Sequence, residues 1–221
     1  MTRINKPISH KAHYFVFIFV IVVLVAQSIT TSVSINKSAA SFQSGDIIFQ
    51  SSQSTQCKAV QLATHSKYSH CGIIFIDKGF TFVYEAVQPV KYTPFKEWIK
   101  HGKDSKYVVK RLKNASTALT PAVLTKMKTV RDKYIGKNYD LYFDWSDDKI
   151  YCSEYVWKIY KQAVNLEVGK LQKLKDFDLS SGPVKDKLKE RYGNHIPLDE
   201  IVVSPQDIFE SELLETVYDG Y

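Results

Sequence analysis

Cysteine is scarce in this chain, and so are dense runs of basic residues. The 221 residues include three cysteines, too few for a disulfide-stapled scaffold, and an odd number leaves at least one thiol unpaired within the chain. The formal net charge of +7 is not gathered into a Lys- and Arg-rich run with interleaved aromatic residues, as nucleic-acid binding would favour. Internal repeats and low-complexity blocks are also absent from the sequence. We therefore expect one globular domain of ordinary size without a nucleic-acid partner.

The basic N-terminal segment lacks an apolar run long enough to span a membrane. Residues 14–26 are uninterruptedly apolar, but as a helix they rise only about 20 Å, short of the ~30 Å hydrocarbon core of a bilayer. Basic residues precede this run and the small residues Ala26 and Ser28 end it, a pattern typical of a secretory signal peptide. We predict a signal peptide over residues 1–28 and a polar linker over residues 29–43.

The alternative for this segment is an uncleaved anchor, in which Ile29 and Val33 lengthen the apolar span and the N-terminus associates with a membrane. In both cases the domain is expected to work outside the cytoplasm, in the periplasm or cell envelope. Without the three basic residues of the first 28, the chain keeps 27 basic and 23 acidic residues, a net charge of +4. That modest excess suits an anionic envelope polymer or membrane surface.

Strand and helix patterns alternate along residues 44–221, the predicted folded domain. Apolar runs bounded by Gly, Pro and Asp predict strands, and apolar residues at helical spacing after Ser, Thr or Pro predict helices. Strands are predicted at residues 47–49, 70–76, 80–87 and from 107, helices at 54–65, 93–101, 120–136, 152–164, 184–192 and after Pro205, and a loop at 138–150. This order predicts the α+β class, with a small antiparallel sheet packed with helices.

Cys152 stands in the first turn of one predicted helix. Apolar residues follow it at helical spacing, including Tyr155, Val156 and Ile159. A helix N-terminus presents free N–H groups and the positive end of a dipole, which favour the thiolate, and the thiolate is the nucleophile. An isolated cysteine on a helix is more often a small buried hydrophobe, so a catalytic interpretation needs a histidine that reaches it.

His70 is the best placed of the six histidines. It opens a strongly apolar strand, which would put its imidazole at the edge of a core on a rigid element. The other five lie in the N-terminal segment, near a helix end or in polar contexts where solvation is the simplest expectation. His70 is therefore the candidate base for Cys152.

The predicted hairpin brings an acid to His70. If its two-residue turn centres on Asp77-Lys78, His70 lies directly opposite Glu85, and if it centres on Lys78-Gly79 the two are diagonal neighbours on one face. Both arrangements are within side-chain reach, whereas a three-residue turn would separate them. Glu85 also interrupts an apolar strand, where an acid needs a partner.

Cys152, His70 and Glu85 together form a nucleophilic constellation. The histidine would take the thiol proton, the acid would fix the tautomer of the ring, and the backbone N–H of Cys152 would help to hold an oxyanion. In isolation each of these residues has an ordinary structural explanation, and it is their joint placement that favours catalysis.

Two metal sites fit the sequence less well. A zinc site built from Cys57, His65, His70 and Cys71 would have no recognised ligand spacing, and successive strand residues point to opposite faces. The aspartates at positions 144, 147 and 148 lack the glycine and terminal glutamate of an EF-hand loop. We therefore expect no metal and no cofactor.

Four segments of the chain, in their order and spacing, resemble the YiiX/YebB-like family. This family comprises circularly permuted relatives of the NlpC-type papain-like cysteine hydrolases, includes bacterial envelope proteins and is distantly similar to lecithin:retinol acyltransferase. The resemblance runs from about Ser44 to Asp207. The four segments are Gly45-Asp46-Ile47-Ile48-Phe49, Tyr68-Ser69-His70, Tyr84-Glu85-Ala86-Val87 and Tyr151-Cys152-Ser153-Glu154.

The resemblance implies a permuted papain-like (NlpC-type) fold with Cys152 as nucleophile, His70 as base and Glu85 as orienting residue. It also implies that Tyr68 helps to shape the oxyanion or substrate pocket, while Asp46 is expected to be a structural residue at a turn and strand edge. The implied activity is hydrolysis of an amide or ester, or acyl transfer, through a thioester, with a peptidoglycan peptide or a lipid amide as substrate. The alternative is a non-catalytic envelope module that binds cell-wall fragments or lipid.

Overall fold

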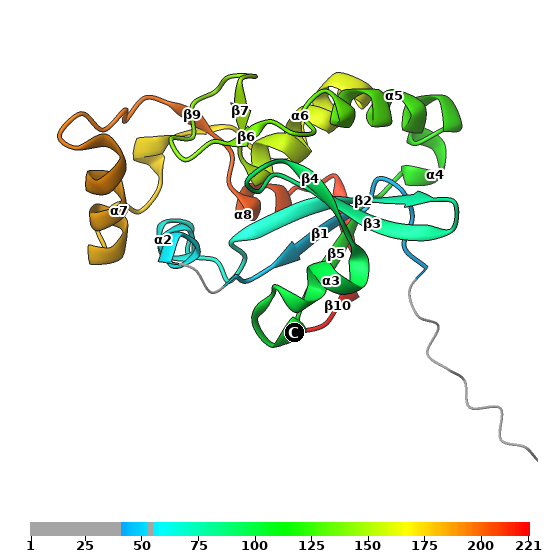
Figure 1. The fold of residues 1–221 in the computed structure, drawn as a ribbon, viewed down its shortest axis with the longest axis horizontal. Helices are drawn as coiled ribbons and strands as arrows, with labels where there is room; N and C mark the ends of the chain where they lie inside the picture. The colour runs from blue at the N-terminus through cyan, green and yellow to red at the C-terminus, as the bar shows by residue number, and fades with distance from the viewer. Residues whose placement is uncertain (1–40, 53–54) are drawn as a thin grey trace, which may run out of the picture. The chain divides into compact units, whose positions relative to one another are not determined.

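The computed structural model describes residues 41–221 apart from residues 53 and 54 (Figure 1). The predicted signal peptide over residues 1–28 lies outside this part of the chain, as does the predicted linker except for its last three residues. Within the described residues, no helix is both long enough and apolar enough to cross a membrane.

A six-stranded sheet forms the centre of the described structure (Figure 1). Its strand order is β10-β5-β1-β2-β3-β4, and every neighbouring pair is antiparallel. The strands are β1 (Ile47–Gln50), β2 (His70–Asp77), β3 (Phe80–Glu85), β4 (Lys91–Pro94), β5 (Val108–Leu112) and β10 (Leu214–Asp219). The predicted α+β class with an antiparallel sheet is confirmed, and β10 is a strand that the sequence patterns did not predict.

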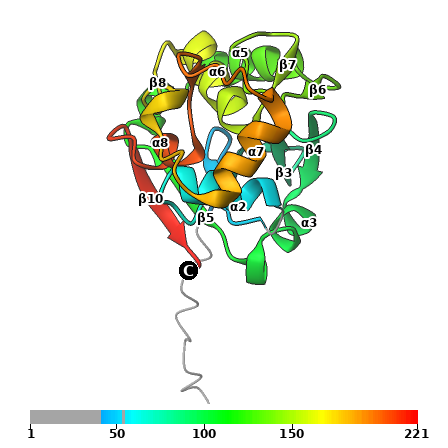
Figure 2. The ribbon, with the colours of Figure 1, turned by 90° about the vertical axis from the view of Figure 1, so that its left-hand side faces the viewer.

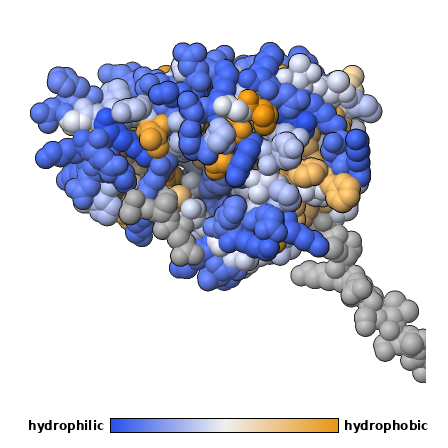
Figure 3. All heavy atoms as spheres, viewed as in Figure 1, coloured by the Kyte–Doolittle hydropathy of each residue, from blue (hydrophilic) through white to orange (hydrophobic). Residues whose placement is uncertain are grey.

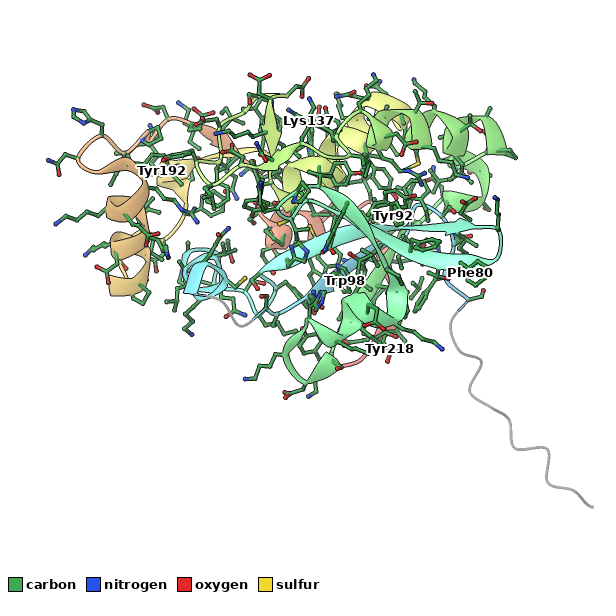
Figure 4. The ribbon with its side chains drawn as sticks, in the orientation of Figure 1. Phe80, Tyr92, Trp98, Lys137, Tyr192 and Tyr218 are labelled. Atoms are coloured by element: carbon green, nitrogen blue, oxygen red, sulfur yellow. The ribbon has the colours of Figure 1, made fainter. Side chains whose placement is uncertain are left out.

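Helices cover both faces of this sheet. They are α3 (Phe95–Lys100), α4 (Ala115–Ala118), α5 (Pro121–Asp132), α6 (Cys152–Val164) and α8 (Pro205–Phe209). On one face α5 and α6 pack over a large core that includes Phe49 and Ile73, and on the other α3 packs over a smaller core around Trp98 (Figures 1 and 4). Because strand residues alternate between faces, the first three residues of β1 supply both cores and are all apolar.

A further pair of helices lies at one end of the described structure (Figure 1). Helix α2 (Thr55–Ala63) lies beside α7 (Gly182–Tyr192), as both ribbon views show (Figures 1 and 2). Two short sheets and two 3₁₀ turns complete the fold: β6 (Asn138–Tyr139) with β7 (Lys149–Ile150), β8 (Gln172–Lys173) with β9 (Ile201–Val202), η1 (Lys103–Ser105) and η2 (Leu174–Asp176). The segment predicted to be a loop at 138–150 thus contains both strands of a small parallel sheet.

The two Thr-Pro sequences behave differently. Thr120 caps α5, and its Oγ1 accepts a hydrogen bond of 3.3 Å from the backbone N–H of Val123, as the pattern predicts. Pro94 instead ends β4, so that α3 begins at Phe95. The prediction that a helix starts at Thr93 was wrong, because the Thr93 hydroxyl donates a hydrogen bond of 2.6 Å to Glu85 instead of capping a helix.

Asp46 has the structural function expected from its position. Its carboxylate is buried and accepts two hydrogen bonds of 2.7 Å from Arg111, from Nε to Oδ1 and from Nη2 to Oδ2. Arg111 lies on β5, the neighbour of β1, so this bidentate pair ties the start of β1 to the adjacent strand.

The face drawn in Figure 3 is mostly hydrophilic, with apolar residues in small separate groups. Phe80 at the start of β3 is 69% exposed and Tyr92 on β4 is 56% exposed (both labelled in Figure 4). Single exposed apolar side chains are ordinary on protein surfaces and do not define a docking surface.

Candidate active site

Cys152 is the first residue of α6, and hydrogen bonds from a later segment of the chain fix the start of this helix. Ser153 Oγ donates to the backbone oxygen of Val203 at 2.7 Å, and Tyr151 Oη accepts from the backbone N–H of Val203 at 3.1 Å. Cys152 is 4% exposed. The thiol therefore sits at the positive end of a 13-residue helix, on a terminus that cannot fray freely.

The β2–β3 hairpin places His70 beside Glu85. Ile73 pairs with Tyr84 and Asp77 with Phe80, so the turn centres on Lys78-Gly79 and the second of the two predicted registers is the one observed. His70 Nε2 lies 2.6 Å from Glu85 Oε2, as expected for diagonal neighbours on one face.

Glu85 is held by three donors. Besides the imidazole, Trp98 Nε1 donates to Oε2 at 2.8 Å and the Thr93 hydroxyl donates to Oε1 at 2.6 Å. Trp98 of α3, labelled in Figure 4, stacks on the His70 ring with the ring centroids 5.9 Å apart. Burial would raise the pKa of Glu85, but the hydrogen bonds from His70, Thr93 and Trp98 lower it, so this buried carboxylate is ionised.

The Cys152 thiol contacts both His70 and the neighbouring Cys71. Hydrogen bonding from the Cys71 side chain, together with the hydrogen bond and charge of His70, lowers the pKa of Cys152 well below its ordinary value, against the opposing effect of burial. Burial would lower the pKa of His70, but its hydrogen bonds with Cys152 and Glu85 raise it well above 6.5. The site therefore favours a thiolate–imidazolium pair.

Three groups of alternating charge thus follow one another: thiolate, imidazolium and carboxylate. Because Glu85 engages Nε2 of His70, Nδ1 is the ring nitrogen left for the thiol. Such an arrangement can supply a sulfur nucleophile together with a proton carrier whose tautomer is fixed. The structure brings together all three residues that the sequence singled out as a triad.

Two cavities open on this group of residues. The first, here the Cys152 pocket, has a volume of about 110 Å³ and runs between α2 and α7. Its wall is largely apolar, and includes Ala59, Val60, Ala63, Phe143, Leu174, Phe177, Leu179, Val184 and Leu188 as well as Cys152. The thiol, although 4% exposed, is therefore reached through an apolar passage.

The second cavity, here the His70 pocket, has a volume of about 440 Å³ and lies on the imidazole side. Its wall carries His70 and Glu85 and many uncharged polar side chains, namely Gln50, Ser52, Gln56, Ser69 and Gln88. Gln56, Ser69 and Tyr139 belong to the walls of both pockets, so they mark the boundary between the two cavities.

Tyr139 and Gln56 are site residues that sequence reasoning missed. Gln56 Nε2 donates to Tyr139 Oη at 3.1 Å, which joins α2 to the segment of β6. The aromatic residues of 138–150 were a signal, but no local pattern says that a tyrosine of this segment will line the same pocket as a thiol on another element. Tyr68 lies elsewhere: it is 3% exposed and packs against Phe49 and Phe209, outside the walls of both pockets.

Among the described residues, no group of three or more His, Cys, Asp or Glu side chains is placed to hold a metal ion. His65, from the rejected zinc alternative, pairs with Asp178 at 3.3 Å. Asp147, from the rejected calcium alternative, forms an ion pair of 2.7 Å with Lys158. Both residues therefore have other partners.

A cysteine at the start of a helix, packed on an antiparallel sheet that carries a histidine, is the arrangement of the papain-like class. In this chain the histidine strand comes before the cysteine helix. The match to known families agrees: residues 41–218 fit the model of the family described as "Permuted papain-like amidase enzyme, YaeF/YiiX, C92 family". The chain belongs to this family of permuted papain-like amidases. The predicted permuted papain-like fold is thereby confirmed.

Two relatives from Escherichia coli are similar over most of the chain. "Uncharacterized protein YiiX" of strain K12 is 54% identical over 175 residues, which cover 79% of this chain and 85% of that protein. A crystal structure of "metalloprotein yiiX" from O157:H7 is 52% identical with a TM-score of 0.77, and covers 81% of this chain and 98% of that one.

Proposed function

We propose that this chain is an exported cysteine amidase that cleaves acyl amides through a thioester on Cys152. The observation that carries the proposal is the His70 ring, which contacts the Cys152 thiol and bonds Glu85 Oε2 at 2.6 Å. An imidazole held between a thiol and an ionised carboxylate is the arrangement that nucleophilic catalysis by cysteine needs.

In the first half of the proposed reaction, Cys152 Sγ attacks the carbonyl carbon of the substrate. The new C–S bond forms as the carbonyl π electrons move to oxygen, where the backbone N–H of Cys152 stabilises the negative charge. The imidazolium of His70 gives its proton to the leaving nitrogen as the C–N bond breaks. Glu85 remains ionised throughout and stabilises the imidazolium before that transfer.

In the second half, water resolves the thioester. Neutral His70 removes a proton from the water molecule, whose oxygen attacks the carbonyl carbon. The C–S bond then breaks, the acid leaves, and the thiolate is restored beside the imidazolium. One water is consumed and one amine and one acid are released, so the cycle returns the enzyme to its starting state.

The proposed substrate is an N-acyl or lipid amide. The Cys152 pocket is lined mainly by aliphatic and aromatic side chains of α2, α7 and the segment between β8 and α7, which suits a hydrocarbon chain. Its charged members, Lys187 and Arg191, both belong to α7. A polar, charged peptidoglycan peptide would leave many of its groups unpaired against such a wall, so we favour lipid over peptidoglycan.

The related crystal structure is described as that of a metalloprotein. In this chain the described residues form no cluster of three or more metal-binding side chains, and the Cys152, His70 and Glu85 groups are engaged with one another. The described residues therefore do not fit a resident metal, and the proposed reaction is written without one.

Export to the periplasm or cell envelope is part of the proposal. It is supported by the apolar run of residues 14–26 with its basic N-terminal flank. N-terminal sequencing of the protein recovered from the envelope should begin after Ser28; an intact Met1 would show that the segment is retained, and would leave membrane association through the N-terminus.

The proposal is tested by the reactivity of Cys152. Iodoacetamide labelling of the peptide that contains Cys152, followed by mass spectrometry across a pH series, should give a midpoint well below the free thiol value of about 8.5. Release of a fluorescent amine from an N-decanoyl anilide should occur with the native chain and cease in Cys152→Ala. Equal turnover by Cys152→Ala would remove Cys152 as the nucleophile, and an ordinary thiol titration without any turnover would favour a non-catalytic module that binds lipid or cell-wall fragments.

A further inference from the structure

The nucleophile and the proton donor face different cavities. Cys152 is in the wall of the Cys152 pocket, which His70 and Glu85 do not line, whereas His70 and Glu85 are in the wall of the His70 pocket, which Cys152 does not line. The two walls share Gln56, Ser69 and Tyr139. A substrate that reacts at the thiol can therefore extend in two directions of different chemistry.

The direction of each half of the substrate follows from the proposed reaction, on which this inference rests. The acyl half becomes bonded to Cys152 Sγ, so it extends from the thiol into the apolar pocket. The leaving nitrogen must receive its proton from His70, and hydrogen-bond reach of the imidazole is a requirement for that transfer. The leaving half therefore extends over His70.

We propose that the His70 pocket is the subsite for the leaving amine and for the acyl acceptor, and that it takes a small, polar, uncharged or amine-bearing group such as an amino alcohol. The same pocket holds the leaving amine while the thioester forms and the acceptor while the thioester is resolved. Both groups exchange a proton with His70 and must therefore lie within its reach. An amine bound there competes with water, so the enzyme transfers acyl groups as well as hydrolysing them.

The wall of the His70 pocket sets the chemistry of this group. The basic side chains among the described residues that line it are His70 and His101, so a phosphate would lack the Lys and Arg side chains that usually bind it. The carboxylate of Glu85 is already engaged by three donors. The hydrogen-bonding capacity that remains belongs mainly to amide and hydroxyl side chains, which recognise neutral polar groups.

Gln50, in the wall of the His70 pocket, has a side-chain oxygen without a hydrogen-bond partner among the described residues. It is 1% exposed and lies at the end of β1, paired with His70 across the ladder. Its Oε1 atom is buried and has no hydrogen-bond partner among the described residues, which is unusual because buried polar groups in native proteins are nearly all hydrogen-bonded. This oxygen lies against Gly102, and a rotation of the Gln50 amide toward the His70 pocket, whose wall it helps to form, would let it accept a hydrogen bond from a hydroxyl or amine of a bound acceptor.

The acceptor step balances without a redox partner. The amine nitrogen attacks the thioester carbonyl carbon, a C–N bond forms and the C–S bond breaks. Neutral His70 takes the proton lost by the amine, and the departing sulfur becomes the thiolate beside the resulting imidazolium. The products are an N-acyl amine and the starting enzyme.

The test separates acceptor binding from acylation by following a single acyl-enzyme. The native chain is acylated with p-nitrophenyl decanoate, and the burst of p-nitrophenol measures acylation of Cys152. Ethanolamine is then varied, and the ratio of N-decanoylethanolamine to decanoate is measured by mass spectrometry after subtracting the Cys152→Ala background. Because both products come from one thioester, their ratio does not depend on how fast that thioester forms.

In the native chain the ratio should saturate with ethanolamine, since the acceptor is bound before it reacts. Gln50→Leu should raise the half-saturating concentration roughly fivefold, the factor for one neutral hydrogen bond. Ser52→Phe should also raise the half-saturating concentration, because the larger side chain fills part of the His70 pocket. Ala63→Phe, the matched change in the Cys152 pocket, should slow acylation by decanoate and leave the ratio unchanged.

A product ratio that rises linearly with ethanolamine concentration in the native chain would overturn the inference. So would a half-saturating concentration that stays at its native value in both His70-pocket variants. In either case a Cys152-dependent burst would still support the amidase proposal. The burst amplitude of each variant reports whether it is folded, so either variant can carry the test alone. Absence of any Cys152-dependent release of p-nitrophenol by the native chain would overturn the proposed function, and the acceptor subsite with it.

Discussion

Replacing Glu85 by Gln should remove one charge from the site and leave its hydrogen bonds intact. Glu85 Oε2 accepts from both His70 and Trp98, whereas Oε1 accepts only from the Thr93 hydroxyl. A glutamine can therefore keep its carbonyl oxygen toward the two N–H donors and turn its NH₂ toward Thr93, whose hydroxyl can accept as well as donate. The variant is nearly isosteric, so the buried packing around Trp98 is preserved.

The expected magnitude follows from the loss of charge assistance. A hydrogen bond to a charged group contributes about 1.5–3 kcal/mol and a neutral one about 0.5–1.5 kcal/mol, a difference of about 1.4 kcal/mol, which corresponds to about one pKa unit. The pKa of His70, raised well above 6.5 in the native site, should fall by about one unit in Glu85→Gln. The pH range over which thiolate and imidazolium coexist then narrows from its alkaline end.

The measurement is a pH titration of the His70 Cε1–H resonance by two-dimensional NMR, assigned by its loss in His70→Asn. Thr93→Val is the matched control, because it removes a hydrogen bond to Glu85 but keeps the carboxylate beside the imidazole, and it should move the midpoint by less than half as much. An unchanged midpoint in Glu85→Gln would refute the reasoning, and would mean that the carboxylate does not stabilise the imidazolium.

Two further predictions concern neighbouring buried groups. Cys71→Ala removes the thiol whose hydrogen bond most lowers the pKa of Cys152, so the midpoint of iodoacetamide labelling at Cys152 should rise by about one pH unit; an unmoved midpoint would assign the whole effect to His70 and the helix dipole. Burial raises the pKa of Glu154 to about 8, even though Lys158 lies 2.8 Å away. The folded state thus retains a proton that the unfolded state loses above about pH 4.5, and stability should fall as pH rises from there toward 8. Urea unfolding at pH 6 and pH 8 should differ by about 2 kcal/mol in the native chain, and Glu154→Gln should abolish most of that difference; a slope that persists in the variant would contradict this assignment.

Local patterns determined much of the fold. The sequence shows the apolar runs that form β1, β2 and β3, and it shows the Cys152 helix. Burial of one face of an element requires apolar residues at a regular spacing, and that spacing can be read from the sequence. A two-residue turn within Asp77-Lys78-Gly79 allowed two registers that both bring His70 and Glu85 together, and one of these is observed. The sequence alone did not exclude the three-residue turn that would have separated them, so the structure decided the length of the turn.

Other parts of the fold were decided by contacts between distant segments. Strand β10 mixes acidic and apolar residues and is half exposed, so only its pairing with β5 makes it a strand. Thr93 resembles a helix cap, but a buried carboxylate eight residues earlier accepts the hydrogen bond of its hydroxyl. Edge strands and such long-range hydrogen bonds carry little local signal, because the partner is not a neighbour in sequence.

The sequence by itself determined that a cysteine would begin a helix, that a histidine would begin a strand, and that an acid would stand beside that histidine if the hairpin had a two-residue turn. Only the tertiary structure decided that α6 packs on β2 so that the thiol meets the imidazole. It also decided that Tyr139 and not Tyr68 lies at the site, and that an apolar and a polar cavity meet there. The physical reason is that periodicity and turn chemistry act over a few residues, whereas a pocket is formed by side chains from elements whose relative placement depends on the packing of the whole core.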